Sequence, residues 1–207
     1  MRVILASASP RRRELLGALL SDFEVIPSHV PEEATGDPAG DARRLALAKA
    51  RAVAALACGA VVVGADTIVH DGQRSYGKPA DAGEAARMLR ALRGREHSVY
   101  TGLAVVAGGL ELAGLSVSQV RLAALTVEQI DAYVASGRPL DKAGAYAIQD
   151  EDVPTVAGLE GCYCAVVGLP LWNLARLLEA AGVSCREPAA WYARCKACPE
   201  RPGTSPA

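Results

Sequence analysis

Two acidic residues, Asp66 and Glu33, are of the type that binds a divalent cation or activates a water molecule. Asp66 ends the run AVVVGAD at residues 60–66, which has the β-branched composition of a buried strand. Ligands of open α/β sheets bind beyond the carboxyl ends of strands, where a carboxylate can bind Mg²⁺ or orient water. Glu33 lies in a polar loop and would be a second ligand of such a cation. A turn-capping aspartate and a solvated loop glutamate are the alternatives.

Three consecutive arginines follow a short strand pattern in LASASPRRRELL, residues 5–16. Cations at the start of a helix oppose the helix dipole, whose positive end is the N-terminus. They are favourable if an anion binds there, because free backbone N–H groups and guanidinium groups both bind phosphate. A solvated basic turn is the alternative, and this stretch alone does not decide between the two.

Two lysines extend the set of cations. Lys78 stands between Gly77 and Pro79, which restrict the backbone around it, and Lys49 lies on the apolar side of an alanine-rich helix pattern. A partly buried cation needs an anionic partner, either a structural carboxylate or a bound ligand. Four cations and two carboxylates would suit a triphosphate with a divalent metal, but sequence spacing does not show that they converge.

The elements that must position these residues alternate between strands and helices. Strands are expected at residues 2–6, 25–27 and 60–66, and two more between 97 and 125 joined at Gly108–Gly109. Helices are expected at residues 11–20, 41–57 with Asp41 as N-cap, 81–92 capped by Asp81, 127–135 capped by Thr126 and ended by Gly137, and 168–182. This order predicts an α/β fold with a mixed sheet, in one domain over residues 1–185.

Composition excludes several classes of protein. The net charge is −1 and aromatic residues make up 4%, so neither a general attraction to nucleic acid nor extended base-stacking surfaces are expected. No apolar run approaches the roughly 20 residues of a membrane span, and the start does not resemble a signal peptide. We therefore expect a cytoplasmic protein that binds no nucleic acid and no membrane. The oligomeric state is open, with a homodimer as one assembly.

Six cysteines are expected to be reduced thiols in that compartment. Cys195 and Cys198 form a C-x-x-C pair, which is half of a zinc site or a redox pair. Cys185 would be a third ligand, but no fourth lies nearby in the sequence, so an incidental pair is favoured. Residues 186–207 are predicted to be a disordered or loosely attached tail.

Seven motifs occur in a specific order: LASASPRRRELL, LALAKA, GADTIV, GKP, HSVYTGLAV, DKAGAYAIQD and VVGLPL. This set, from residue 2 to about 182, resembles the Maf family of nucleotide pyrophosphatases, once described as septum-formation inhibitors. The resemblance implies an elongated mixed sheet with flanking helices and two lobes around a central cleft, similar to inosine triphosphate pyrophosphatases. It also implies hydrolysis of nucleoside triphosphates to monophosphate and pyrophosphate, aided by a divalent cation such as Mg²⁺ or Mn²⁺.

The resemblance also implies roles for individual residues. Asp66 would be the catalytic acid/base residue, and Arg11, Thr67 and Gln149 would set substrate choice. The phosphate and metal site would be completed by Ser9, Arg12, Glu33, Lys49 and Lys78. Arg11 and Arg12 would point into the cleft and Arg13 into solvent.

The segment DKAGAYAIQD resembles the branch of the family that acts on dTTP and UTP, and differs from the branch that acts on 7-methyl-GTP. A glutamine amide offers both a donor and an acceptor to a uracil or thymine edge. The expected function is therefore removal of dTTP, UTP and modified pyrimidine nucleotides from the nucleotide pool. A nucleotide-binding regulator of cell division with little turnover is the alternative. Two departures from the family pattern are a short loop between Glu33 and Lys49 and the cysteines of LEGCYCAVVGLP.

Overall fold

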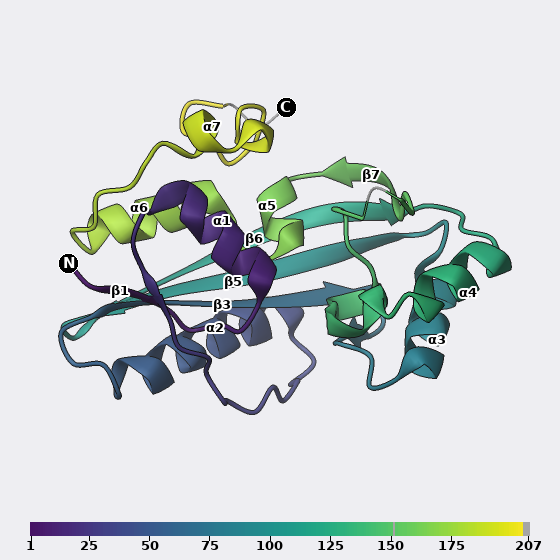
Figure 1. Ribbon diagram of the computed structural model, residues 1–207, viewed down its shortest axis with the longest axis horizontal. Coiled ribbons are helices and arrows are strands. Elements are labelled where there is room, and N and C mark those ends of the chain that lie inside the picture. Colours follow the sequence, from purple (N-terminus) through teal and green to yellow (C-terminus); the bar gives the residue numbers. More distant parts are fainter. Residues whose placement is uncertain (151, 205–207) are drawn as a thin grey trace.

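A seven-stranded mixed sheet runs the length of the molecule, with helices on both faces (Figure 1). The computed structural model describes residues 1–150 and 152–204. The strand order is β2-β1-β3-β5-β6-β7, with β4 paired to β3; β1 is parallel to β2 and β3, and the other pairs are antiparallel. The strands are β1 (Val3–Leu5), β2 (Glu24–Val25), β3 (Val61–His70), β4 (Ser75–Tyr76), β5 (Glu96–Ala107), β6 (Leu110–Leu122) and β7 (Val156–Glu160).

The helices are α1 (Pro10–Leu19), α2 (Pro38–Ala54), α3 (Ala82–Leu92), α4 (Val127–Ala135), α5 (Tyr163–Val167), α6 (Leu171–Ala180) and α7 (Pro188–Trp191), with 3₁₀ turns η1 (Arg138–Asp141), η2 (Ala143–Ala145) and η3 (Ala193–Cys195). Side-chain caps mark the starts of α1, α2, α3 and α4, whereas α5, α6 and α7 begin without one. Asp81 and Thr126 accept hydrogen bonds from backbone N–H groups of α3 and α4, which confirms both predicted caps.

The predicted start of α2 is wrong by one turn. Asp37 is the N-cap and accepts a hydrogen bond from the Ala39 N–H, while Pro38 takes the first helical position. Asp41 lies inside the first turn, buried, where it accepts hydrogen bonds from Thr35 and Arg44. Asp37 and Asp41 are both of a residue type that caps helices. Asp37 is the cap because Pro38, which directly follows it, is favoured at the first helical position.

Helices cover both faces of β3, so its residues alternate between two apolar layers. Val61, Val63 and Ala65 pack in the cluster that includes α1, α5 and α6, whereas Val62 packs in the cluster beneath α2.

Helix α2 approaches the sheet closely because Gly64 and Gly102 face it. A Cβ atom at Gly64 would lie 2.2 Å from a backbone oxygen of α2, and one at Gly102 would lie 2.1 Å from another.

A third apolar cluster, around α3 and α4, forms the far end of the elongated sheet (Figure 1). The molecule therefore has two lobes, one built on α1, α2 and α6 and the other on α3 and α4. No helix in the described part of the chain is both long and apolar enough to cross a membrane.

The C-terminal segment differs from the prediction of a loose tail. Residues 188–204 fold into α7, η3 and turns above α1 and α6 (Figure 1). Ala189, Cys195 and Cys198 are buried in the main core cluster, and the Trp172 indole N–H donates to the Cys195 carbonyl at 3.0 Å. The segment was predicted to be loose because its composition is mostly polar, and the few small apolar residues that attach it gave no clear signal. Residues 205–207, which were part of the same prediction, lie outside the described residues.

Candidate active site

A pocket of about 280 Å³ opens at the carboxyl end of β1. Strand β1 ends at Leu5, whereas its neighbour β3 continues to His70. The crevice therefore forms where open α/β sheets usually bind ligands, beyond a strand end. Eight of the nine predicted site residues line this central pocket: Ser9, Arg11, Arg12, Lys49, Asp66, Thr67, Lys78 and Gln149.

A buried lysine joins two carboxylates in the wall of the pocket. The Lys49 Nζ atom lies 2.6 Å from Asp66 Oδ1 and 2.5 Å from Glu32 Oε1. The side chains of Lys49 and Asp66 are 8% and 7% exposed, whereas that of Glu32 is 54% exposed. Partial burial alone would raise the pKa of Glu32, but the hydrogen bond and charge of Lys49 lower it. The anionic partners expected for Lys49 are therefore present.

Glu32, and not the predicted Glu33, lies at the pocket. Glu33 is exposed and is not part of the lining, and its backbone carbonyl accepts a hydrogen bond from Arg44. Neighbouring side chains in a non-helical segment point in different directions, so one of the pair faces Lys49. Nothing in the local sequence distinguishes two adjacent glutamates, and the choice became visible only in the fold.

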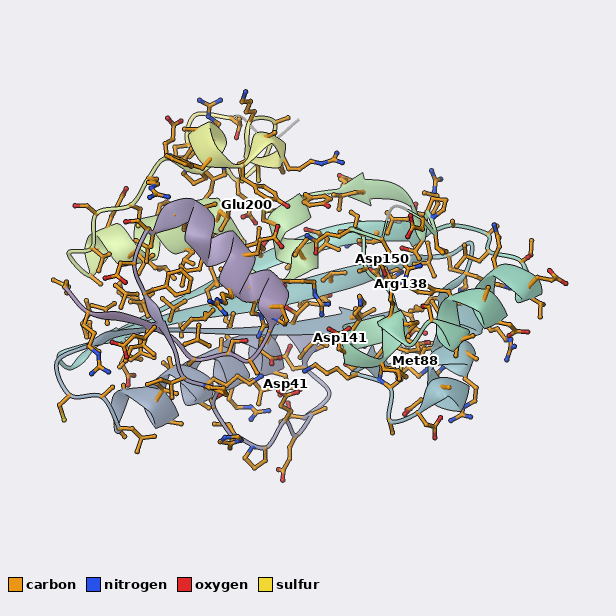
Figure 2. All side chains as sticks on the ribbon, in the orientation of Figure 1. Asp41, Met88, Arg138, Asp141, Asp150 and Glu200 are labelled. Atoms are coloured by element: carbon orange, nitrogen blue, oxygen red, sulfur yellow. The ribbon has the colours of Figure 1, made fainter. Side chains whose placement is uncertain are left out.

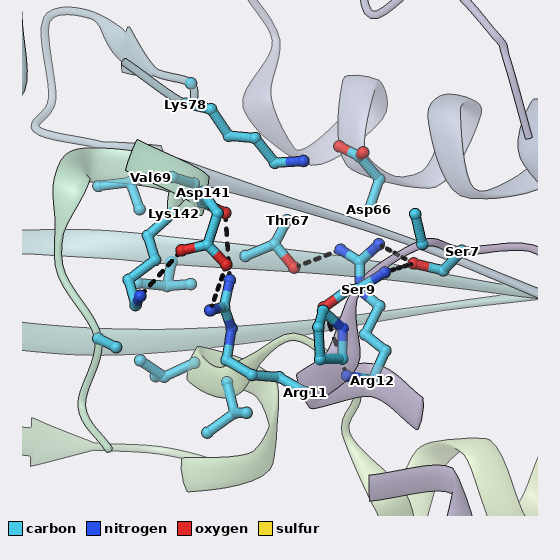
Figure 3. Close-up of a pocket in the computed structure, with 18 of the residues that line it drawn as sticks. Ser7, Ser9, Arg11, Arg12, Asp66, Thr67, Val69, Lys78, Asp141 and Lys142 are labelled. Carbon is cyan, nitrogen blue, oxygen red and sulfur yellow. Dashed lines mark hydrogen bonds and ion pairs between the residues drawn. The ribbon is translucent and has the colours of Figure 1, made fainter. Parts of the chain in front are cut away.

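Arg12 is held in place by backbone carbonyls and by the hydroxyl groups of Ser7 and Thr67, and Figure 3 shows the two hydroxyl contacts. Its Nε atom donates to the Gly168 carbonyl at 2.9 Å, and Nη1 donates to the Ala65 carbonyl at 2.8 Å. Its Nη2 atom donates to the Thr67 hydroxyl at 3.1 Å. Burial lowers the pKa of Arg12, yet an arginine remains charged at neutral pH even so. Arg12 is therefore a fixed positive charge in the pocket.

Thr67 positions Arg12 through a chain of hydroxyl groups. Its Oγ1 atom lies 3.1 Å from Thr101 Oγ1, which donates to the Ala165 carbonyl at 2.8 Å. Because an arginine only donates, Thr67 accepts from Arg12 and its own proton goes to Thr101. The role of Thr67 in substrate choice stays a prediction, and the contact that the structure gives it is the one to Arg12.

Arg11 ties the start of α1 to the opposite side of the pocket. Its guanidinium donates to Asp141 Oδ2 at 2.9 Å and to the Asp141 carbonyl at 3.1 Å (Figure 3). Lys142 donates to the same carboxylate at 2.8 Å. Although partial burial opposes it, the hydrogen bond from Lys142 and the charge of Arg11 lower the pKa of Asp141. Asp141 and Lys142 were missed as site residues, although DKAGAYAIQD contains both.

Lys78 and Gln149 are the side chains most available to a ligand. Lys78 is exposed and extends across the pocket toward Asp66 (Figure 3), and within the described residues it makes no ion pair. Gln149 is half-buried in the lining, and its amide has no hydrogen-bond partner among the residues that the structure describes. Arg13 is exposed, as expected.

The electrostatics of the pocket favour an anion. Five cationic side chains line it against three carboxylates. The N-terminus of α1 also faces it, capped by the Ser9 hydroxyl and with no acidic residue in its first turn. The arrangement can hold a polyanion beside a carboxylate that is positioned to orient or deprotonate water.

Comparisons with known proteins agree with this geometry. The sequence matches the family Maf-like protein over residues 2–181. It is 50% identical over 186 residues to a dTTP/UTP pyrophosphatase of Moorella thermoacetica, covering 88% of this chain and 96% of that protein. Proteins of the same name from Koribacter versatilis and Thermococcus gammatolerans are each 46% identical, covering 88% and 84% of this chain and 96% of each relative.

A crystal structure of a Vibrio cholerae protein aligns with 66% of this chain and 73% of that one. Its TM-score is 0.36 and its sequence identity 18%, a likeness too distant to carry an argument. The family match, in contrast, spans every element from β1 to α6. The chain therefore belongs to the Maf-like protein family.

Proposed function

We propose that the protein hydrolyses dTTP, UTP and modified pyrimidine nucleoside triphosphates to the monophosphate and pyrophosphate. The observation that carries this proposal is the buried Asp66–Lys49 pair at the edge of a pocket with an excess of cations. The relatives named dTTP/UTP pyrophosphatase support the same reaction and the same substrates. The proposed location is the cytoplasm, where nucleotide pools are held.

Glu32 and Asp66 are the residues that would hold a divalent cation. Glu32 Oε1 and Asp66 Oδ1 both contact the Lys49 Nζ atom, at 2.5 and 2.6 Å, so the two carboxylates lie side by side, and the other oxygen of each has no hydrogen-bond partner among the described residues. Carboxylate oxygens are the ligands that Mg²⁺ and Mn²⁺ prefer, with waters and substrate phosphates completing the shell. When bound, the cation would neutralise charge on the phosphates. This assignment replaces Glu33 by Glu32 as the partner of Asp66.

The chain's own residues account for the remaining steps. The N-terminus of α1, with Arg11, Arg12 and Lys78, binds the triphosphate and stabilises the charge that develops as the linkage breaks. Asp66 orients a water molecule and accepts its proton as the water oxygen bonds to phosphorus. The phosphorus–oxygen bond between nucleotide and pyrophosphate breaks, and Lys49 keeps the Asp66 carboxylate in position.

Gln149 is proposed to recognise the base. Its free amide faces the pocket and offers an acceptor and a donor side by side. Uracil and thymine present a carbonyl next to an N–H, which matches this pair. Cytosine presents an amino group next to a bare ring nitrogen and would leave the pair unmatched unless the amide reoriented.

Pyrophosphate release from a panel of triphosphates with Mg²⁺ tests the proposal. The panel comprises dTTP, UTP, CTP, GTP, 5-methyl-UTP, pseudo-UTP and 7-methyl-GTP. Turnover that is fastest on the uracil and thymine nucleotides supports it. Tight binding of a nucleotide without turnover would support the alternative of a regulator of cell division, and a preference for 7-methyl-GTP would overturn the substrate assignment alone.

A further inference from the structure

Four cysteines gather behind the pocket, where the C-terminal segment meets α5. Cys162 is the N-cap residue of α5 and Cys164 lies in its first turn. Cys195 ends η3, and Cys198 follows three residues later. All four are buried free thiols. The spacing of Cys195 and Cys198 indicated a pair but no fourth ligand, because the C-x-C pair lies more than thirty residues earlier in the chain.

The four sulfur atoms form a chain of contacts that runs from Cys195 through Cys164 and Cys162 to Cys198, and their side chains must close around an ion to share it. Cys164 Sγ and Cys195 Sγ are 3.5 Å apart. The Cys162 thiol interacts with the thiols of both Cys164 and Cys198. The sulfurs of Cys162 and Cys198 and a carboxylate oxygen of Glu200 lie within 4.8 Å of one another.

We propose that Cys162, Cys164, Cys195 and Cys198 bind one Zn²⁺ ion in a four-thiolate structural site. Thiolate ligands select zinc, and structural zinc sites with four cysteines are tetrahedral with Zn–S distances of about 2.3 Å. That geometry separates the sulfurs by about 3.8 Å. The 3.5 Å contact between Cys164 and Cys195 is close to this value and far from the ~2.05 Å of a disulfide.

Packing of small apolar side chains is the plain alternative, because free cysteines are often buried in cores. Two observations weigh against it. The Glu200 Oε2 atom is buried without a hydrogen-bond partner among the described residues, beside the sulfurs of Cys162 and Cys198. Figure 2 shows Glu200 on the side of the C-terminal segment that faces the body. The other oxygen, Oε1, accepts a hydrogen bond from the Ser116 hydroxyl, so one carboxylate oxygen of Glu200 is satisfied and the other is left facing the thiols.

The second observation is that this segment is attached by polar and aromatic contacts and buries few apolar side chains. Trp172 donates to the Cys195 carbonyl, the Ser116 hydroxyl donates to Glu200, and Arg201 lies over the Trp172 ring. Of residues 188–204, the buried side chains are Pro188, Ala189, Cys195 and Cys198, and Tyr192 packs partly against the core, so the buried apolar area is small. Ordering a chain segment costs conformational entropy at every residue, and small side chains recover little of it. A metal bound by two segments far apart in the sequence supplies the missing stabilisation, as in other small metal-held units.

The test is metal analysis of the full-length chain, purified without a histidine tag and without chelators. The protein is expected to contain one zinc ion per chain, released when a mercurial reagent modifies the thiols. The double variant Cys195→Ser/Cys198→Ser is expected to lose the zinc and to unfold at lower temperature. Cys58→Ser is the matched control, since Cys58 is exposed and far from the cluster in the sequence; it should retain the zinc.

A second measurement keeps the proposal testable if a variant misfolds. Metal-free wild-type protein, titrated with Co²⁺, should show the strong charge-transfer absorption of thiolate ligands, saturating at one ion per chain. Wild-type protein that binds neither zinc nor cobalt would overturn the proposal, as would two disulfides in place of four free thiols. Loss of zinc in Glu200→Gln equal to that in the cysteine variants would overturn the four-thiolate assignment.

Discussion

Asp66→Asn should lower the rate of hydrolysis strongly while the protein remains folded. The substitution keeps the shape of the side chain and an oxygen near Lys49 but removes the charge and the proton acceptor. Losing a general base costs about 10²–10⁴-fold in rate. We therefore expect kcat for dTTP to fall by at least about a hundredfold in a protein that still folds.

The stability cost follows from what remains around Lys49. Glu32 still lies 2.5 Å from its ammonium group, and the new amide oxygen can still accept a hydrogen bond. We expect Asp66→Asn to lower the free energy of unfolding by about 1–3 kcal/mol, the size of one charge-assisted hydrogen bond. Lys49→Met leaves the buried Asp66 carboxylate without its ion-pair partner, and should cost about 3–5 kcal/mol. The double variant should be more stable than Lys49→Met.

Two assays check this reasoning: pyrophosphate release with dTTP and Mg²⁺, and urea unfolding in the presence of a chelator. Arg51→Ala is the matched control, because the Arg51–Glu111 pair lies on the surface and should contribute at most about 1 kcal/mol. Near-normal kcat in Asp66→Asn would refute the role of Asp66. A larger loss of stability in Asp66→Asn than in Lys49→Met would refute the electrostatic argument.

Three further predictions concern the metal, the base and acid stability. Glu32→Gln should raise the Mg²⁺ concentration for half-maximal rate by about tenfold or more, whereas Glu33→Gln should not; equal effects would contradict the placement of Glu32. Gln149→Ala should lower kcat/KM for UTP more than for CTP, by about 1–3 kcal/mol in activation free energy, and equal losses would mean that Gln149 does not recognise the base. His97 is 3% exposed, and burial lowers its pKa to about 4, so the folded protein holds it neutral. The unfolded chain binds a proton below about pH 6.5, so stability is lost as pH falls from about 6.5 to 4, by about 3 kcal/mol. Urea unfolding of His97→Gln across this range should show a shallower pH dependence than wild type; parallel curves would rule the histidine out.

Local signals in the sequence were sufficient to predict many of the helices and strands. The caps at Asp81 and Thr126 each depend on a side chain and an N–H group three residues away, so the sequence contains the whole interaction. The run that ends at Asp66 identifies its strand, because β-branched residues on both faces indicate burial on both sides. The ordered motifs placed eight of nine site residues in one pocket.

What the sequence did not show depends on contacts between distant segments. Arg11 meets Asp141 across 130 positions, and no spacing rule connects them. The choice between Glu32 and Glu33 depends on which one faces α2. The four cysteines come from two segments that only the folded chain brings together, so their short spacings carried no signal when taken separately.

The close packing of α2 on Gly64 changes what a functional screen would report. Ordinary contacts need 3.4–4 Å, so a Cβ atom 2.2 Å from the Ala46 carbonyl would push α2 outward by more than an ångström. Lys49 lies on that helix and would move with it, away from Asp66. Displacements of this size at a reacting group can cost about a hundredfold in rate. Alanine at Gly64 would therefore score among the most damaging changes although glycine has no side chain to offer a nucleotide. In the sequence GADT, Gly64 is therefore required for the close approach of α2 to β3, and Asp66 is required for its carboxylate.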